Sequence, residues 1–364
     1  METAAWCAYY LGEFGYALTL AEEGAALADN PGTKARCLVI AGRLLHADGQ
    51  LEEAERRYSD ARKLADESGL STLAAIWLAA LRCDQGHARD ALELLRLAPA
   101  ASDDVDPPLI TRHRELALAR AHMMLGEVAQ ALAALDRLAA DGGPVEIAQV
   151  GPDGANLRAA ILVSLGEVEA ADVINLKELD EARVGQLRPQ LEASLIGLGE
   201  SRLVAGGRRS AMRYSGEAAR ARVAPYPFRW QQRGRSRLLQ ARLELAAGRV
   251  EHALAEARDL MADSSRSGDA VRSVAARLLE AEALAMSGAG IDTQAIGEVL
   301  KRAGDVLGAE AWQITARLAR LTGNAGWEAL AERQLEHVIQ WSGTHAMALR
   351  AFAQSQKELP SSPS

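Results

Sequence analysis

Aromatic residues, lysine and cysteine are all scarce in this chain of 364 residues. Only 4% of the residues are aromatic, five of the 41 basic residues are lysine, and three residues are cysteine. A β-sandwich and a disulfide scaffold are therefore poor fits, because the first draws on aromatic and β-branched residues and the second on cysteine. Alanine instead fills 73 positions. We therefore expect helices, which form readily from Ala, Leu, Glu and Arg.

The chain also lacks the marks of a secreted or membrane protein. Cys7, Cys37 and Cys83 show no CxxC spacing, and each falls in an apolar helical pattern, which predicts small buried side chains in a reducing compartment. The longest charge-free apolar stretch, residues 68–81, is shorter than the roughly 20 residues that span a bilayer. Glu2 stands where a signal peptide would carry Lys or Arg. These features predict a cytoplasmic protein.

Sequence signatures of catalysis and of metal or nucleotide binding are missing as well. The chain contains no GxxxxGK[ST], HExxH, GxSxG or GxGxxG string. Its seven histidines are scattered, and His113 and His122 lie nine residues apart, which is not the spacing of a metal pair on one helix face. The net charge of −8 argues against general nucleic-acid binding. We expect no catalytic residues, no metal and no cofactor.

A repeat of about 40 residues runs along the chain. Glycines that can end one helix and open a turn recur at spacings of 37, 37, 40, 40, 40 and 42 residues, and an alanine follows each of them by five positions. A second small residue precedes each glycine by seven positions. The glycines are Gly12, Gly49, Gly86, Gly126, Gly166, Gly206 and Gly248. Gly290 and, more weakly, Gly323 extend the series to eight or nine units.

Each unit reads as two antiparallel helices joined by a tight turn. Residues 38–61 show apolar positions three and four apart on both sides of Gly49, so one stripe of each helix is expected to be buried. The small residues mark close helix crossings, and neighbouring units must stack to cover their apolar stripes. The expected fold is an all-α, right-handed superhelical solenoid of eight to nine hairpins over residues 1–356. A final helix should lie near residues 346–357, and residues 357–364 should form a disordered tail. Among the loops expected between units is the Ser-, Asp- and Gly-containing stretch 263–268.

This pattern resembles the tetratricopeptide repeat, and residues 38–61 match its small-residue, Gly, Ala, Tyr and Ala positions. The family period is 34 residues, whereas longer Ala-, Leu- and Arg-rich repeats look like the helical arms of bacterial signal-transduction ATPases and LuxR-type regulators. The resemblance implies a sensor arm that binds an inducer or a protein partner. Because the first unit is about one turn short, we expect either that Met1 begins a fragment of a longer protein or that a partner covers this end.

An arginine-rich segment is the first candidate binding region. Residues 183–249 hold 14 arginines, no lysine and four acids, so this segment carries +10 while the rest of the chain carries −18. Arginine binds carboxylate or phosphate, and the aromatic residues near position 228 could stack on a ligand. The predicted anion or acidic-partner site comprises Arg202, Arg208, Arg209, Arg213, Tyr226, Phe228, Trp230, Arg235 and Arg242. The alternative is that these arginines pair with acids of the preceding unit and that the aromatic rings fold onto the next repeat.

The groove formed by the first helix of each hairpin is the second candidate region. The residue after the first small position is Arg43, Arg120 or Arg242 in three of the units, and helical spacing places Arg36, His46 and His113 on the same face. We expect Arg36, Arg43, Arg120 and Arg242 to contact a ligand, although solvation of an exposed helix face would also account for them.

The function these patterns predict is a non-catalytic regulatory or sensor arm that binds a protein partner, a peptide, or a small anionic or sugar inducer in its concave groove. A LuxR-like transcriptional regulator is the expected context. A free-standing adaptor and a peptide-binding receptor are the alternatives, and an enzyme that acts on a phosphorylated substrate is the remaining, weaker one. Direct nucleic-acid or membrane binding is not expected, and the oligomeric state cannot be derived from the sequence.

Overall fold

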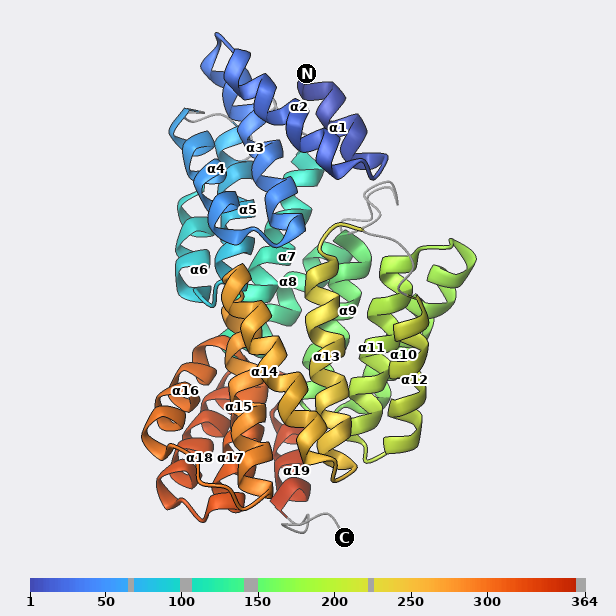
Figure 1. The fold of residues 1–364 in the computed structure, drawn as a ribbon, viewed down its shortest axis with the longest axis vertical. Coiled ribbons are helices and arrows are strands. Elements are labelled where there is room, and N and C mark those ends of the chain that lie inside the picture. Colours follow the sequence, from blue (N-terminus) through green and yellow to red (C-terminus); the bar gives the residue numbers. More distant parts are fainter. Residues whose placement is uncertain (65–68, 99–106, 141–149, 222–225, 358–364) are drawn as a thin grey trace.

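The computed structural model describes residues 1–64, 69–98, 107–140, 150–221 and 226–357, and throughout this part of the chain the regular structure is helical (Figure 1). Within these ranges, nine antiparallel hairpins and one terminal helix follow one another. The helices are α1 (Glu2–Tyr10), α2 (Phe14–Leu27), α3 (Pro31–Asp48), α4 (Leu51–Leu64), α5 (Gly69–Asp84), α6 (Ala88–Leu97), α7 (Pro107–Met124), α8 (Val128–Ala140), α9 (Val150–Ser164), α10 (Val168–Val184), α11 (Arg188–Val204), α12 (Arg208–Ala221), α13 (Arg229–Ala246), α14 (Val250–Ser267), α15 (Ala270–Met286), α16 (Thr293–Val306), α17 (Ala311–Thr322), α18 (Ala325–Gln340) and α19 (Ala346–Lys357). Short 3-10 turns at Gly308–Glu310 and Gly343–His345 precede α17 and α19. The predicted all-α repeat fold is confirmed.

The glycine positions end the first helix of each hairpin. Gly49 adopts φ 84°, and its N–H and that of Gln50 donate to the last carbonyl groups of α3. The six other glycines of the series also have positive φ, a conformation that costs a residue with a Cβ about 1–2 kcal/mol. The eighth unit departs from the prediction, because the glycine with positive φ after α15 is Gly288 (φ 72°) rather than Gly290.

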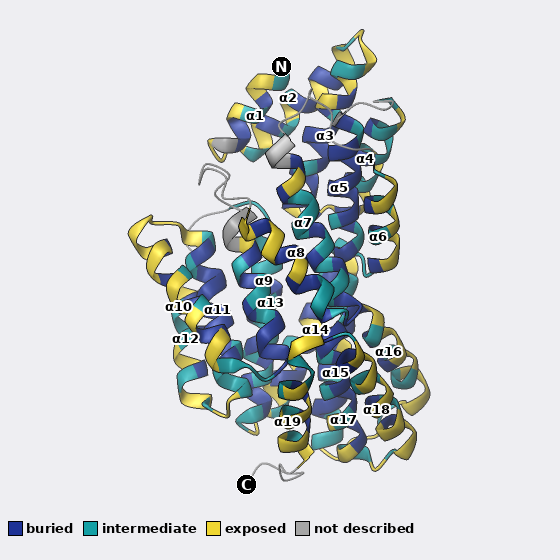
Figure 2. Ribbon diagram, turned by 180° about the vertical axis from the view of Figure 1, so that it is seen from behind, coloured by how far each residue is buried: buried dark blue, intermediate teal, exposed yellow. Residues whose placement is uncertain are grey.

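The two small-residue columns lie at the helix crossings, as predicted. All seven alanines of the second column are fully buried: Ala17, Ala54, Ala91, Ala131, Ala171, Ala211 and Ala253. A Cβ added to Gly42 would come within 2.7 Å of the Tyr58 ring, so only glycine permits α3 and α4 to approach this closely. The burial pattern in Figure 2 follows the same logic, with buried residues concentrated on the inner helices and exposed ones on the outer helices.

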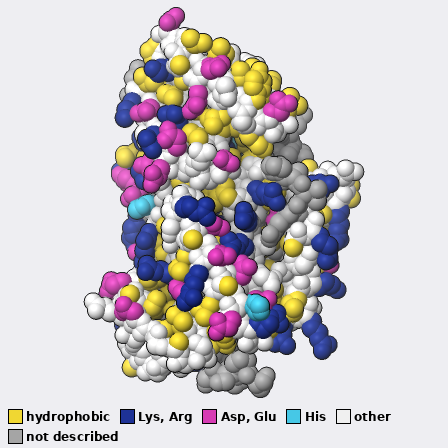
Figure 3. All heavy atoms as spheres, in the orientation of Figure 1, with side chains coloured by type: hydrophobic (Ala, Val, Ile, Leu, Met, Phe, Trp, Pro, Cys, Tyr) yellow, Lys and Arg dark blue, Asp and Glu magenta, His cyan; other side chains and the backbone are white. Residues whose placement is uncertain are grey.

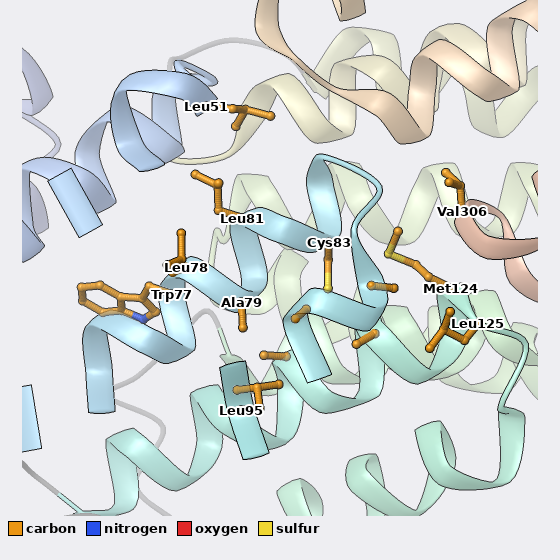
Figure 4. Close-up of a cluster of buried hydrophobic side chains, with 14 of the residues drawn as sticks. Leu51, Trp77, Leu78, Ala79, Leu81, Cys83, Leu95, Met124, Leu125 and Val306 are labelled. Atoms are coloured by element: carbon orange, nitrogen blue, oxygen red, sulfur yellow. The ribbon is translucent and has the colours of Figure 1, made fainter. Parts of the chain in front are cut away.

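The second half of the chain packs against the turns of the first half. A Cβ on Gly86 would meet Ala270 and Val306, one on Gly126 would meet Val338, and one on Gly166 would come within 2.3 Å of the Phe352 ring. Val306 also belongs to the same hydrophobic cluster as Met124 and Leu125 (Figure 4). The superhelix therefore contacts itself over residues that lie far apart in the sequence.

Hydrogen bonds join the two halves at the same places. The Ala129 N–H donates to the Trp341 carbonyl at 2.8 Å, and Gln313 Nε2 donates to the Ser164 carbonyl at 2.9 Å. His345 Nδ1 lies 2.5 Å from a Glu167 carboxylate oxygen, across 178 residues of sequence. Nothing in the repeat pattern alone indicated this closure.

Three local expectations need correction. Cys7 is exposed, whereas Cys37 and Cys83 are buried as expected. Residues 263–268, which read as a loop because of their Ser, Asp and Gly content, continue α14 to Ser267 and end at Gly268 in a left-handed conformation. Lys357 is the last residue of α19, so it does not belong to the expected tail, whose other residues, 358–364, lie outside the described part. No described helix has the length and apolar character that crossing a bilayer requires.

Candidate functional site

A cavity of ≈ 90 Å³ lies inside the superhelix. Its walls come from the inner faces of α3, α5, α7, α9 and α11, which are the first helices of five consecutive hairpins, and from the segment that opens α13. The apolar part of the lining includes Trp77, Leu116 and Phe228. Four carboxamide side chains contribute to the polar part: Asn156, Gln190, Gln231 and Gln232.

Arg43 occupies an aromatic setting in this cavity. Its guanidinium carbon lies 4.3 Å from the centroid of the Phe228 ring and 5.2 Å from that of Trp77, both within the range of cation–π attraction. The Trp77 ring also meets the His113 ring edge-on, with centroids 5.8 Å apart. Within the described residues Arg43 forms no ion pair. The two rings therefore hold this guanidinium, and the Asp153 carboxylate lines the same cavity.

Asp84 is the centre of a buried polar network below the cavity. Only 1% of the residue is exposed, and its carboxylate contacts the Arg120 guanidinium and lies 2.8 Å from His46 Nε2. Gln231 Nε2 donates to both carboxylate oxygens, at 3.1 and 2.9 Å. Burial alone would raise the pKa of Asp84, but the charge of Arg120 and the contact with His46 outweigh it and lower the pKa.

Both histidines of the cavity have a lowered pKa, which favours their neutral forms. Burial lowers the pKa of His46 despite the adjacent Asp84. Burial, with the nearby guanidinium groups of Arg43 and Arg112, lowers the pKa of His113 to about 3. A neutral His46 that donates through Nε2 leaves Nδ1 as an acceptor, and this atom has no hydrogen-bond partner in the described part of the chain.

The segment Tyr226–Gln231 closes the cavity by docking on α3. The Phe228 N–H donates to the Ala47 carbonyl at 2.9 Å, and Trp230 Nε1 donates to the His46 carbonyl at 3.0 Å. A Cβ on Gly49 would lie 3.1 Å from the Trp230 ring, so glycine is what lets this ring approach the turn after α3. Tyr226 Oη donates to Glu192 at 2.6 Å and ties the same segment to α11. Phe228 itself has φ 61°, an uncommon conformation for a residue with a Cβ.

The structure divides the predicted site residues into three groups. Arg43, Arg120, Tyr226 and Phe228 line the cavity together, with His46 and His113 from the groove face. Trp230 packs behind the cavity wall, against Gly49. The remaining arginines lie outside the cavity: Arg36, Arg202, Arg208, Arg209, Arg213, Arg235 and Arg242.

Several of the arginines outside the cavity pair with carboxylates, but only Arg202 and Arg235 pair with acids of the preceding hairpin, as the alternative interpretation expected. Arg202 pairs with Asp172 of the preceding unit, and Arg36 pairs with Glu2. Arg235 lies 2.6 Å from Glu200, and Arg242 lies 3.2 Å from Glu310. The arginine-rich segment therefore does not form one continuous site, and the residues exposed on α12 stand apart from the cavity.

The sequence interpretation missed several lining residues, Trp77 and Asn156 among them. Asp84, which organises the network, was missed as well. Helical spacing could have found two of them. In α5 the residue after the small position is Ala80, which faces the groove, and Trp77 and Asp84 lie three residues before it and four residues after it. Within the described residues no three His, Cys, Asp or Glu side chains gather in a way that could hold a metal ion.

The fold defines a tetratricopeptide-like helical repeat protein, and comparison with solved structures agrees. The chain is similar to a Rap protein in complex with competence and sporulation factor, at 15% identity and a TM-score of 0.64 over 98% of this chain and 97% of the other. It also matches a signal-transduction ATPase with a tetratricopeptide repeat sensor from Pyrococcus horikoshii, at 14% identity and a TM-score of 0.44 over 94% of this chain and 52% of the other. No family model and no curated protein sequence matches the chain. At these identities the likeness concerns the fold alone.

Proposed function

We propose that this chain is a non-catalytic receptor whose central cavity binds a peptide segment. The observation that carries the proposal is the convergence of carboxamides from three elements, Asn156 on α9, Gln190 on α11 and Gln232 on α13, on one cavity inside the superhelix. A carboxamide presents a donor and an acceptor side by side, which is the pattern that a peptide backbone also presents. An extended peptide can therefore exchange hydrogen bonds with several of them at once.

Two further features support a peptide ligand. Trp77 Nε1 is a buried donor and Asn156 Oδ1 a buried acceptor, and neither has a partner among the described residues, so each gains a hydrogen bond from a polar ligand. Arg43 adds a cation that forms no ion pair among the described residues and can bind a carbonyl or carboxylate oxygen. The Rap protein of similar fold is in complex with competence and sporulation factor, which is consistent with a receptor function for this architecture.

The cavity volume limits what is enclosed. A buried cavity of roughly 150 Å³ holds a benzene molecule, so ≈ 90 Å³ suits one small side chain. We propose that one residue of the peptide is enclosed while its neighbours extend toward Asp153, which is exposed on the first turn of α9. A longer enclosed segment requires the Tyr226–Gln231 segment to move away from α3.

A thermal-shift screen against a pool of random hexapeptides tests the proposal, because a ligand that binds the native state raises the unfolding temperature. We expect peptides that stabilise the parent protein to lose most of this effect with Arg43→Gln or Asn156→Ala. Arg258→Gln is the matched control, since Arg258 is exposed on α14 and pairs with Glu280. The proposal is contradicted if the peptides stabilise both cavity variants as much as the parent protein. It is also contradicted if no peptide stabilises the parent protein.

The free-standing adaptor is the second candidate function. It is favoured by the exposed arginines of α12, which lie on the outer surface and away from the cavity. An adaptor binds its partners whether or not the cavity is occupied. A receptor changes its partner affinity when the cavity is filled, so measuring partner binding with and without a cavity ligand distinguishes the two.

The regulatory setting is a separate proposal that follows from the repeat resemblance. We propose that the receptor belongs to a cytoplasmic bacterial regulator of the LuxR type and responds to a peptide or small inducer there. Reading the source gene on both sides of this segment tests the setting. A coding sequence for a P-loop or a helix-turn-helix in the same frame is the expected result, and the absence of both contradicts it.

A further inference from the structure

The outward face of α12 concentrates positive charge on the surface of an acidic protein. Arg208, Arg209, Arg213 and Arg220 are all exposed on this helix, and Met212 between them is 43% exposed. The opposite face of the helix is buried through Ala211, Ser215 and Ala218. In Figure 3, basic side chains gather along the edge of the molecule where α12 lies.

The stability of the helix itself does not account for these arginines. Arg208 and Arg209 occupy the first turn, where the helix dipole disfavours positive charge. Arg209 and Arg213 lie four residues apart, a spacing at which like charges destabilise a helix by about 0.2–0.5 kcal/mol. A helix selected only for stability would carry acids at its start and alternate the two signs of charge.

Only some of the four exposed arginines of α12 have interaction partners among the described residues. Arg208 donates to the Ala246 carbonyl at 2.7 Å, and Arg213 lies 3.9 Å from Glu217 and stacks on Tyr214. Within the described residues Arg209 and Arg220 form no ion pair. This contrasts with Arg202, Arg235 and Arg242, each of which meets a carboxylate.

The shape of the face suits a close protein contact. Gly216 and Ala219 lie between the arginines, and a Cβ on Gly216 would meet only the tip of Arg220, at 3.8 Å. The centre of the face is therefore shallow, with Met212 as its apolar contact and guanidinium groups around it. Arginine and methionine are both enriched in protein interfaces.

We propose that this face, the α12 face (Arg208, Arg209, Met212, Arg213, Gly216, Ala219 and Arg220), docks an acidic amphipathic helix of a partner protein. Carboxylates four and eleven positions apart on such a helix would match Arg209, Arg213 and Arg220, and an apolar side chain between them would cover Met212. The exposed Met212 at the centre of the face favours a protein partner, because a peptide helix presents apolar side chains beside its carboxylates whereas a phosphate backbone does not. This surface is separate from the cavity, so it does not depend on the peptide receptor function.

A designed helical peptide of about 18 residues tests the proposal by fluorescence anisotropy at physiological ionic strength. This peptide carries glutamates at the three positions that match Arg209, Arg213 and Arg220, with leucine between them. A second peptide has the same sequence except that glutamine replaces each of the three glutamates. We expect the glutamate peptide to bind at least about tenfold more tightly. The double variant R209Q/R213Q should remove this difference, whereas R209K/R213K should keep most of it. The control variant R258Q should keep all of it.

Three results overturn the proposal. If the two peptides bind equally tightly, or if neither binds, charge complementarity does not attract a partner to this face. An equal loss in R258Q shows that the attraction is not local to the α12 face. Tighter binding of a duplex DNA fragment than of the glutamate peptide, abolished by R209Q/R213Q, assigns the surface to nucleic acid instead.

Discussion

Asp84 and Gln231 lie 147 residues apart in the sequence, yet the amide of Gln231 donates to both oxygens of the Asp84 carboxylate. Through this contact α13 is joined to α5, and through His46 and Arg120 the same carboxylate reaches α3 and α7. One buried acid thus links helices α3, α5 and α7 to the segment Tyr226–Gln231, which closes the cavity.

Replacing Asp84 by alanine should strongly destabilise the fold. The change leaves the Arg120 guanidinium without its carboxylate partner and removes the acceptor of His46 and Gln231, and breaking a buried pair in this way typically costs about 3–5 kcal/mol. Urea denaturation followed by circular dichroism measures the loss. Asp305→Ala is the control: Asp305 pairs with Arg89 at the surface, where such a pair contributes about 0–1 kcal/mol. Similar losses in both variants would contradict the role given to Asp84.

Substituting alanine for Gly166 should cost more than the same change at Gly206. Both glycines have positive φ, 81° and 75°, so both variants incur about 1–2 kcal/mol of backbone strain. Only the Gly166 variant also drives a Cβ into the Phe352 ring, because nothing lies within 4 Å of the corresponding position at Gly206. We expect an extra loss of about 1–3 kcal/mol from this overpacking. Equal unfolding free energies for the two variants would show that the contact with α19 does not constrain the turn.

His113 should make the protein less stable in mild acid. Its pKa is lowered to about 3 in the folded state, against an ordinary value of 6.5, so the unfolded chain binds a proton between these values that the folded chain does not. The contribution of His113 to the unfolding free energy is therefore intact above about pH 6.5 and falls by about 1.4 kcal/mol per pH unit below it, as far as pH 3.

The measurement compares the parent protein with His113→Gln. The difference in unfolding free energy between them should shift in favour of the variant as the pH falls from 6.5 to 4. His87→Gln is the control, since half of the His87 side chain is exposed. A pH-independent difference for His113→Gln would mean that this imidazole is protonated in the folded protein.

Trp230→Ala should loosen the closure of the cavity without unfolding the repeats. The change removes the hydrogen bond to the His46 carbonyl and the ring that packs against Gly49, both of which hold the start of α13 on α3. Amide hydrogen exchange should accelerate at Phe228, whose N–H donates to Ala47, while the amides of α17 keep their protection. Unchanged exchange at Phe228 would indicate that other contacts are sufficient to close the cavity.

The repeat was predictable because its signals are local. A glycine at each turn and an alanine at each crossing follow from backbone conformation and from the distance between two adjacent helices, so Gly49 and Ala54 could be placed from spacing alone. The groove face was also accessible in part, since helical periodicity brought Arg43, Arg120, His46 and His113 to the cavity.

The closure of the superhelix could not be predicted in the same way. The contacts of Trp230 with α3 and of Phe352 with Gly166 depend on the small rotation between successive hairpins, summed over several units. No single stretch of sequence encodes that sum. The network of Asp84 was missed for the same reason, because its partner Gln231 belongs to α13 and lies 147 residues further along the chain.

Four turn glycines contact the second half of the chain: Gly49, Gly86, Gly126 and Gly166. Because these contacts require each hairpin at its own place, they constrain the number of hairpins in the fold. In an open solenoid each unit touches only its neighbours, so units can be added or removed with a nearly constant change in stability. Here, deleting the hairpin α7–α8 would remove Gly126, on which Val338 of α18 packs. It would also move the second half of the chain away from its contacts with Gly49 and Gly86. The repeats are similar in sequence, but they are not interchangeable parts, and the chain should unfold as one cooperative unit rather than from its ends.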